Sequence, residues 1–256
     1  MIGFTKRLIL KTVRSLGYDI TPYGKNQLSG FPPDFNEEEM ETIKQAQPYT
    51  MTGRANMFSF IHAVKNIVKN NVPGDIVECG VWKGGSMMVA ARTLANLKIS
   101  DRTLWLYDTY EGMTKPTEDD VSWHGEDADK TFKQLKTGDN SADWCHGPLE
   151  GVKQAVFSTG YDQAMFKFIK GPVEETIPDN LPKQIAILRL DTDFYESTKH
   201  ELKHLYPLLS RGGILIIDDY GFWKGSRKAV DEYIRDNNLP IFLHRIDSTA
   251  RLAIKL

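Results

Sequence analysis

Two periodicities in the distribution of apolar and polar residues predict where strands and helices lie. After residue 74, short apolar runs alternate with amphipathic segments of helical spacing. The short runs predict strands over residues 75–79, 103–107, 165–169, 185–190, 213–217, 240–245 and 250–254. The amphipathic segments predict helices over residues 86–97, 149–159, 173–177, 197–209 and 227–237. Strands that alternate with helices are typical of a mostly parallel, doubly wound α/β sheet with right-handed crossovers.

The C-terminal end departs from this alternation, because a short polar turn joins the last two predicted strands. So short a connection can join only antiparallel strands. We therefore expect a Rossmann-like sheet that is parallel except for a C-terminal antiparallel hairpin.

Two other segments interrupt the pattern. Residues 1–46 combine an amphipathic helix, with apolar residues spaced from Phe4 to Leu16, and an irregular stretch rich in Pro, Gly and Asn. Residues 114–143 are acidic and show little apolar periodicity. We interpret them as an insertion or lid over the site, with a disordered, solvated loop as the alternative. The predicted organisation is an N-terminal arm over residues 1–46 and one domain over residues 47–256.

The composition limits the kind of partner. The 256 residues are 41% hydrophobic, enough for one packed domain, and 32 basic against 34 acidic residues give a net charge of −2. This balance does not indicate nucleic acid binding, so a small neutral or polar molecule is the expected partner. Two widely separated cysteines indicate a reducing compartment, and no apolar run resembles a secretion signal or a membrane span. We expect a cytoplasmic protein without stable membrane insertion.

Aspartates cluster at the ends of two predicted strands. Asp191 and Asp193 follow one apolar run, and Asp218 and Asp219 follow the next. The carboxyl ends of parallel strands meet at one edge of a sheet, where carboxylates repel one another unless a cation or a proton intervenes. Mg²⁺ prefers such oxygen ligands and would lower the pKa of a substrate hydroxyl. The pattern predicts Asp191, Asp218 and Asp219 as metal ligands and Asp193 as general base. The alternative for Asp218 and Asp219 is a helix-capping pair.

A glycine-rich loop joins the first predicted strand to its helix, Glu78-Cys79-Gly80-Val81-Trp82-Lys83-Gly84-Gly85-Ser86. The spacing Gly-x3-Gly-Gly differs from the Gly-x-Gly-x-x-Gly of dinucleotide sites. The carboxylate of Glu78 would repel a pyrophosphate but attract the ammonium and sulfonium groups of S-adenosylmethionine. The loop therefore favours S-adenosylmethionine over NAD, with Glu78, Gly80, Val81, Trp82, Gly84, Gly85 and Ser86 as candidate cofactor-binding residues.

Two further positions extend this candidate cofactor site. Asp108 ends the second predicted strand, where a carboxylate can accept hydrogen bonds from two ribose hydroxyls. Taken alone, Asp108 would be interpreted as a turn residue or a helix cap. Gly171 follows the third strand, where backbone can lie against adenine, although Gly-Pro is also common in turns.

One short motif indicates different chemistry. His200-Glu201-Leu202-Lys203-His204 matches H-E-x-x-H, which on a helix can place two imidazoles on zinc with the glutamate as base. The leucines of this segment indicate a helix that covers the sheet, and no third ligand stands out downstream. Surface histidines on a solvated face are the preferred interpretation, and a zinc hydrolase is the alternative.

Four ordered motifs resemble the macrocin O-methyltransferase (TylF/MycF/NovP) family, over residues 73–86, 108–112, 190–198 and 216–221. The resemblance extends from about residue 47 to the C-terminus and includes Thr50 and Met51, which lie near the cofactor in the family. It implies a class I methyltransferase sheet and Mg²⁺-dependent methyl transfer from S-adenosylmethionine to a hydroxyl of a sugar or glycosylated natural product.

The resemblance also implies roles for single residues. Asp191, Asp218 and Asp219 would hold the metal, and Asp193, with Asp191, would be catalytic. Family members are expected to form homodimers and to use the arm and the insertion for substrate contacts and dimerisation. A catalytically silent S-adenosylmethionine-binding module is the non-enzymatic alternative, which would need the glycine loop but not the aspartates.

Overall fold

The structure is a computed structural model that describes Val13 and residues 31–256. The chain divides into two compact units, Met1–Asn36 and Glu37–Leu256. The N-terminal helix expected between Phe4 and Leu16 lies outside the described residues except for Val13. The second unit carries the sheet and begins with helix α2 (Glu37–Ala46), which the predicted organisation had placed in the arm.

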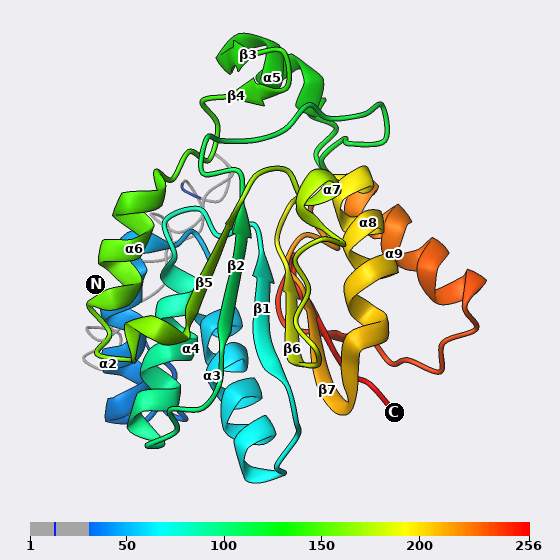
Figure 1. Cartoon of the computed structure of the whole chain (residues 1–256). Helices are drawn as coiled ribbons and strands as arrows, with labels where there is room; N and C mark the ends of the chain where they lie inside the picture. Colours follow the sequence, from blue (N-terminus) through cyan, green and yellow to red (C-terminus); the bar gives the residue numbers. More distant parts are fainter. Residues whose placement is uncertain (1–12, 14–30) are drawn as a thin grey trace, which may run out of the picture. The chain divides into compact units, whose positions relative to one another are not determined.

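A seven-stranded sheet with the order β5-β2-β1-β6-β7-β9-β8 forms the centre of the second unit (Figure 1). Its strands are β1 (Asp75–Cys79), β2 (Leu104–Asp108), β5 (Phe166–Lys170), β6 (Ile185–Leu190), β7 (Leu209–Ile217), β8 (His244–Arg245) and β9 (Arg251–Ile254). The first five strands in the order are parallel, whereas β9 is antiparallel to both β7 and β8. The predicted doubly wound, mostly parallel sheet with a C-terminal antiparallel hairpin is confirmed.

Helices cover both faces of this sheet, as Figure 1 shows. One face carries α2, α3 (Arg54–Lys69), α4 (Gly85–Asn96) and α6 (Leu149–Phe157). The other carries α7 (Val173–Thr176), α8 (Tyr195–Leu205) and α9 (Lys224–Asp236). Every residue of β6 is buried, as expected for a central strand of a sheet that is covered on both sides. The loops that follow the five parallel strands therefore emerge at one edge of the sheet.

The predicted end of one helix was wrong. The helix expected over residues 197–209 ends at Leu205 and continues as a 3-10 turn, and Leu209 already belongs to β7. Pro207 lies in this turn and has no amide hydrogen, so it cannot extend the α-helical hydrogen-bond ladder.

The extent of one strand was also wrong. The strand expected over residues 240–245 contains only His244 and Arg245. Ile241 and Leu243 pack against the core without joining the sheet, and Phe242 between them is 80% exposed.

The insertion over residues 114–143 carries secondary structure of its own. It contains α5 (Ala128–Leu135) and a small hairpin of β3 (Lys136–Gly138) and β4 (Ser141–Ala142). Ala128 packs with Phe194 and Trp223, which come from other parts of the chain. A partner so far away in the chain leaves no periodic apolar pattern within the insertion.

Hydrogen bonds attach the insertion to the beginnings of α8 and α9. The Lys224 amide donates to Val121 O at 3.0 Å. The carboxylate of Asp120, which is fully buried, accepts from the Tyr195 amide at 2.8 Å. The insertion is thus fastened to the two helices that follow the aspartate-bearing strands.

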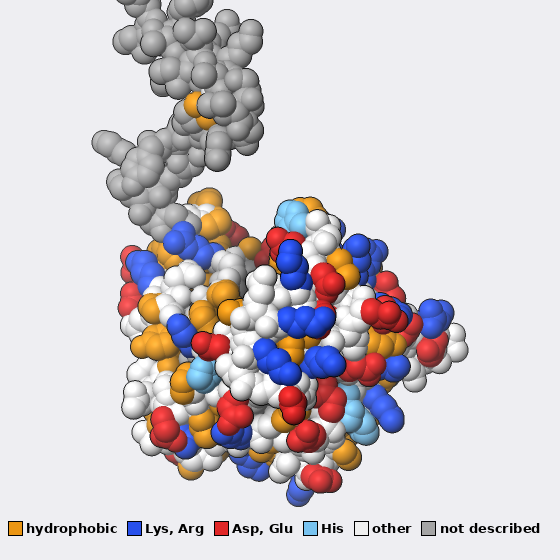
Figure 2. All heavy atoms as spheres, turned by 90° about the horizontal axis from the view of Figure 1, so that it is seen from above, with side chains coloured by type: hydrophobic (Ala, Val, Ile, Leu, Met, Phe, Trp, Pro, Cys, Tyr) orange, Lys and Arg blue, Asp and Glu red, His pale blue; other side chains and the backbone are white. Residues whose placement is uncertain are grey.

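The surface of the molecule carries charges of both signs. Figure 2 shows acidic and basic side chains on the same face, in keeping with the nearly neutral net charge. Among the described residues, no helix is long and apolar enough to cross a membrane.

Candidate active site

A cavity of about 400 Å³ opens at the carboxyl ends of the parallel strands, where α/β sheets bind ligands. Its walls come from the loops after β1, β2, β5, β6 and β7, from the Tyr49–Thr52 segment and from residues that flank the insertion. The predicted site residues that line it are Thr50, Met51, Gly80, Val81, Trp82, Ser86, Asp108, Gly171, Asp191, Asp193, Asp218 and Asp219. The candidate cofactor and metal sites are therefore two parts of one cavity.

Three predicted cofactor residues, Glu78, Gly84 and Gly85, lie behind the wall of this cavity. Gly84 contacts α6, and Gly85 lies so close to the Tyr49–Thr52 segment that a Cβ atom would come within 2.6 Å of Thr50 Cβ. These two glycines therefore serve close packing of the chain against itself.

Gly80 allows the loops after β1 and β6 to touch. It has a φ of +82°, which glycine adopts readily, and a Cβ atom here would overlap the carbonyl oxygen of Asp191. The first glycine of the loop is thus required by the neighbouring aspartate loop, a reason that the spacing alone did not reveal.

Asp108 ties the glycine loop to the end of β2. Its Oδ2 atom accepts from the amides of Val81 at 2.7 Å and Trp82 at 2.9 Å, and its Oδ1 accepts from the Tyr110 amide at 2.7 Å. Burial raises the pKa of Asp108, and the amide hydrogen bonds oppose this shift. Asp108 lines the cavity at the predicted place, and it also holds the turn that the alternative interpretation expected.

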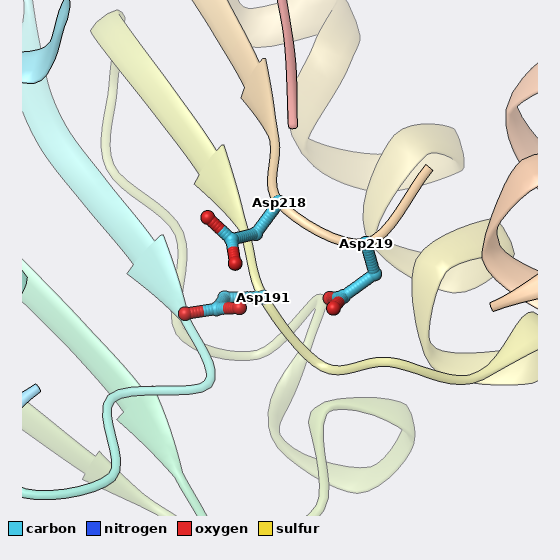
Figure 3. A group of neighbouring side chains, drawn as sticks. All are labelled: Asp191, Asp218 and Asp219. Carbon is cyan, nitrogen blue, oxygen red and sulfur yellow. The ribbon is translucent and has the colours of Figure 1, made fainter. Parts of the chain in front are cut away.

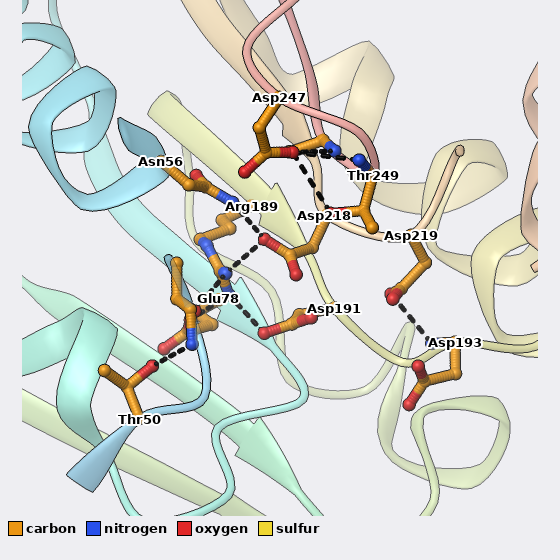
Figure 4. Close-up of polar contacts among 12 residues, drawn as sticks. Thr50, Asn56, Glu78, Arg189, Asp191, Asp193, Asp218, Asp219, Asp247 and Thr249 are labelled. Atoms are coloured by element: carbon orange, nitrogen blue, oxygen red, sulfur yellow. Dashed lines mark hydrogen bonds and ion pairs between the residues drawn. The ribbon is translucent and has the colours of Figure 1, made fainter. Parts of the chain in front are cut away.

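Arg189 is the site residue that the sequence analysis did not identify. Its guanidinium is completely buried and donates to Glu78 at 2.6 Å, to Asp191 at 2.5 Å and to Asp218 at 2.6 Å (Figure 4). Thr52 Oγ1 lies 3.1 Å from Nη2 of the same group. A single arginine inside the apolar run of β6 was the signal that could have indicated it, because a buried charge requires partners.

The ion pair with Arg189 explains where Glu78 lies. Glu78 is 1% exposed, and burial raises its pKa to about 7, although the guanidinium of Arg189 opposes that shift. The carboxylate therefore faces the core of the sheet, and it does not line the cavity in which we expected it to meet the cofactor.

Asp191, Asp218 and Asp219 point toward one another from the ends of β6 and β7 (Figure 3). Each offers a carboxylate oxygen within 4.8 Å of the others. Burial raises the pKa values of Asp191 and Asp219 far above the usual aspartate range, and neighbouring carboxylates raise them further.

The free carboxylate oxygens of this trio fit a hard divalent cation. Arg189 bonds Asp191 through Oδ2 and Asp218 through Oδ1, and Asn56 Nδ2 also donates to Asp218 Oδ1 at 2.5 Å. In the part of the chain that the structure describes, these contacts use one oxygen of each of the two aspartates. The other oxygens remain available, and three carboxylates with open coordination positions match the donor set that Mg²⁺ prefers.

Asp193 lies next to the three aspartates and is held there by two hydrogen bonds. Trp223 Nε1 donates to its Oδ1 at 2.7 Å, and its own amide donates to Asp219 Oδ2 at 3.2 Å. Burial, together with repulsion by Asp191, raises the pKa of Asp193 to about 7. A carboxylate so placed beside the trio can accept a proton from a group bound there.

The histidines of the H-E-x-x-H motif do not point to this cavity. His200 Nε2 lies 2.9 Å from the carbonyl oxygen of Ile177, and the Glu201 side chain is completely buried beneath α8. Among the described residues, the group of three or more potential metal ligands is the aspartate trio. The geometry thus favours the interpretation of His200 and His204 as surface residues.

The topology and the cavity define the class of this protein. A sheet in the order β5-β2-β1-β6-β7-β9-β8, with a glycine loop after β1 and an aspartate after β2, is that of a class I methyltransferase. The cavity at this edge of the sheet is large enough for small molecules, which bind in pockets of about 300–1,000 Å³.

Comparison with known proteins gives the family. The family model for macrocin O-methyltransferase (TylF) matches residues 24–253. The chain is 35% identical over 185 residues to mycinamicin III 3''-O-methyltransferase of Micromonospora griseorubida. The matched segment covers 72% of this chain and 70% of that protein. It is 31% identical over 201 residues to 8-demethyl-8-(2,3-dimethoxy-alpha-L-rhamnosyl)-tetracenomycin-C 4'-O-methyltransferase of Streptomyces olivaceus, covering 78% and 73% of the two chains.

A solved structure agrees with this assignment. The O-methyltransferase NovP superposes with a TM-score of 0.70 at 30% sequence identity, over 81% of this chain and 82% of the other. The chain belongs to the macrocin O-methyltransferase family and is an S-adenosylmethionine-dependent O-methyltransferase. The predicted family, fold and enzyme class are confirmed.

Proposed function

We propose that this enzyme transfers a methyl group from S-adenosylmethionine to a hydroxyl of a sugar or glycosylated natural product, with Mg²⁺ held by Asp191, Asp218 and Asp219. The observation that carries the proposal is the single cavity that joins the glycine loop and Asp108 to the aspartate trio. The name of the rhamnosyl tetracenomycin relative supports a glycosylated acceptor.

The first half of the cavity suits the cofactor. Thr50, Met51, Gly171 and the loop residues Gly80, Val81, Trp82 and Ser86 line it around Asp108. The proposed contact of Asp108 with ribose hydroxyls would reuse a carboxylate that already orders the loop. Glu78, Gly84 and Gly85 would support this half from behind.

The second half suits the acceptor hydroxyl. Mg²⁺ at the trio would lower the pKa of that hydroxyl, so that it loses its proton near neutral pH. Asp193 would accept the proton, because its carboxylate lies beside the trio and Trp223 fixes its orientation. Asp191, which Arg189 holds in place, would align the hydroxyl with the methyl group.

Mass spectrometry of candidate glycosides incubated with S-adenosylmethionine tests this proposal. We expect the acceptor to gain the mass of one methyl substitution in the presence of Mg²⁺ and not in excess EDTA. Full activity in EDTA would rule out the metal, and failure to bind S-adenosylmethionine at millimolar concentrations in a titration calorimeter would rule out the cofactor.

An Asp193→Asn variant tests the proposed base. It should lose at least about 100-fold in kcat, the range for removal of a general base, and should bind S-adenosylhomocysteine like the wild type. A catalytically silent binding module would bind the cofactor equally well in both proteins and methylate no glycoside in either.

A further inference from the structure

Glu201, the glutamate of the H-E-x-x-H motif, contacts the loop of residues 191–193, which carries two of the site aspartates. It lies on the buried side of α8 and is completely inaccessible to solvent. Its Oε1 atom accepts a hydrogen bond of 3.0 Å from the hydroxyl of Thr192. Thr192 is the residue between Asp191 and Asp193, so this hydrogen bond connects the helix directly to the loop that carries both.

The loop needs such a contact, because its backbone is strained. Asp193 has a φ of +67°, in the left-handed region that residues other than glycine seldom adopt. A residue held there costs on the order of 1–3 kcal/mol unless its surroundings favour the conformation. Trp223 and Asp219 contact Asp193 itself, through its carboxylate and its amide.

The Thr192–Glu201 contact comes from α8 and is separate from the contacts that Trp223 and Asp219 make with Asp193. Burial raises the pKa of Glu201 far above its ordinary value, and repulsion by Glu174 and Asp219 adds to this shift. Burial therefore favours the protonated form of this carboxyl, and its Oε1 atom accepts the hydrogen bond of the Thr192 hydroxyl.

We propose that Glu201 is a positioning residue of this methyltransferase: through the Thr192 hydroxyl, it holds the Asp191–Asp193 loop in the conformation that aims both aspartates at the acceptor. Its effect on turnover rests on the proposed function, whereas its effect on the loop does not. If Glu201 served core packing alone, loss of the Thr192 hydroxyl would not change kcat.

Three variants separate these roles. Thr192→Val removes the hydroxyl while nearly keeping the shape, Glu201→Leu removes the acceptor, and Glu201→Gln keeps a neutral acceptor of the same size. We expect Thr192→Val and Glu201→Leu each to lower kcat about 10- to 100-fold, the scale of a small misplacement of catalytic groups. The kcat of Glu201→Gln should stay within about threefold of the wild-type value. The double variant, Thr192→Val with Glu201→Leu, should have a kcat no lower than that of the slower single variant.

Hydrogen–deuterium exchange of the peptide that spans residues 189–196 provides a readout without turnover. Exchange should accelerate in Thr192→Val and Glu201→Leu and stay slow in Glu201→Gln. The affinity for S-adenosylhomocysteine should change less than about twofold, because that half of the cavity is built from other loops. His204→Gln, on the solvated side of the same helix, is the matched control and should leave both readouts unchanged.

Opposite results would overturn the proposal. One is a kcat and an exchange rate in Thr192→Val that equal those of the wild type. Another is a decrease in kcat in the double variant that equals the product of the two single decreases. The third is a decrease in kcat in Glu201→Gln as large as that in Glu201→Leu. If Glu201→Leu does not fold, the comparison of Thr192→Val with Glu201→Gln still tests whether the hydrogen bond between the two residues holds the loop. If the wild type methylates no glycoside, the proposed function fails, and the exchange rates still test the role of Glu201 in the loop.

Discussion

Arg189 is the residue around which the carboxylates of the site are arranged. One guanidinium contacts Glu78, Asp191 and Asp218, so it offsets only part of the negative charge that β1, β6 and β7 bring together. Removal of one partner from a buried ion pair costs about 3–5 kcal/mol, because the other partner remains buried without compensation. The surplus of negative charge is the physical reason that this edge of the sheet can attract a cation.

The burial of Glu78 predicts that the stability of the protein depends on pH. Burial raises its folded-state pKa from 4.5 to about 7, so the folded protein binds this proton more tightly than the unfolded chain. Its contribution to stability is therefore lost as the pH rises from about 4.5 to about 7. In metal-free protein, the stability of the wild type relative to Glu78→Gln should fall across this window by up to about 3 kcal/mol, as measured by urea unfolding.

Glu111→Gln is the matched control for this measurement. Lys170 lowers the pKa of Glu111 on the surface, so the wild type should gain stability relative to this variant as the pH rises. Equal pH profiles for the two variants would contradict the assigned role of Glu78.

At the scale of elements, the loops after β1 and β6 depend on each other. Gly80 has a positive φ, and a side chain here would overlap the backbone of Asp191. Gly80→Ala should therefore lower the free energy of unfolding by more than about 2 kcal/mol and displace the aspartate loop.

Gly151→Ala is the opposite case within the same fold. Gly151 lies in α6 with open space around its Cα atom, so alanine should stabilise the helix by about 0.5–1 kcal/mol. Urea unfolding curves of the two variants should shift in opposite directions. A neutral Gly80→Ala would show that the two loops do not touch in solution.

The insertion depends on the helices on which it rests. Asp120 accepts hydrogen bonds from the Tyr195 amide and from the amide and hydroxyl of Thr117, which joins the insertion to the first turn of α8. Asp120→Ala should destabilise the protein by about 1–2 kcal/mol, as loss of a helix-capping side chain does, and should speed proteolysis within residues 114–143. Asp119→Ala, which removes a partly exposed ion pair with Lys228, is the control and should change the free energy of unfolding by less than about 1 kcal/mol.

At the scale of the whole molecule, the cavity has two halves built by different strands. β1 and β2 carry the cofactor half, and β6 and β7 carry the aspartates. The variant that combines Asp218→Asn with Asp219→Asn should therefore abolish Mg²⁺-stimulated turnover while changing the affinity for S-adenosylhomocysteine less than about threefold. Titration calorimetry with and without EDTA measures this separation, and a loss of cofactor binding in EDTA would contradict it.

The expected homodimer and the cytoplasmic location also concern the whole molecule. Both stay predictions. Sedimentation analysis of the full chain would measure the subunit number directly.

Local patterns in the sequence determined much of this protein. The alternation of strands and helices, the final antiparallel pair and the placement of Asp108, Asp191 and Asp219 could all be predicted. Backbone geometry brings the carboxyl ends of parallel strands to one edge of a sheet, so residues that follow those strands must meet there. The four motifs likewise indicated the family before any contact was known.

Only the tertiary structure decided which groups pair behind that edge. Glu78 turned out to face Arg189, Gly80 to accommodate Asp191, and Glu201 to contact Thr192 instead of a metal. The insertion forms secondary structure of its own, and its Ala128 packs on Phe194 and Trp223. Such contacts join residues far apart in the chain, and the free energy of a buried charge or a close backbone approach depends on neighbours that a periodic pattern does not contain.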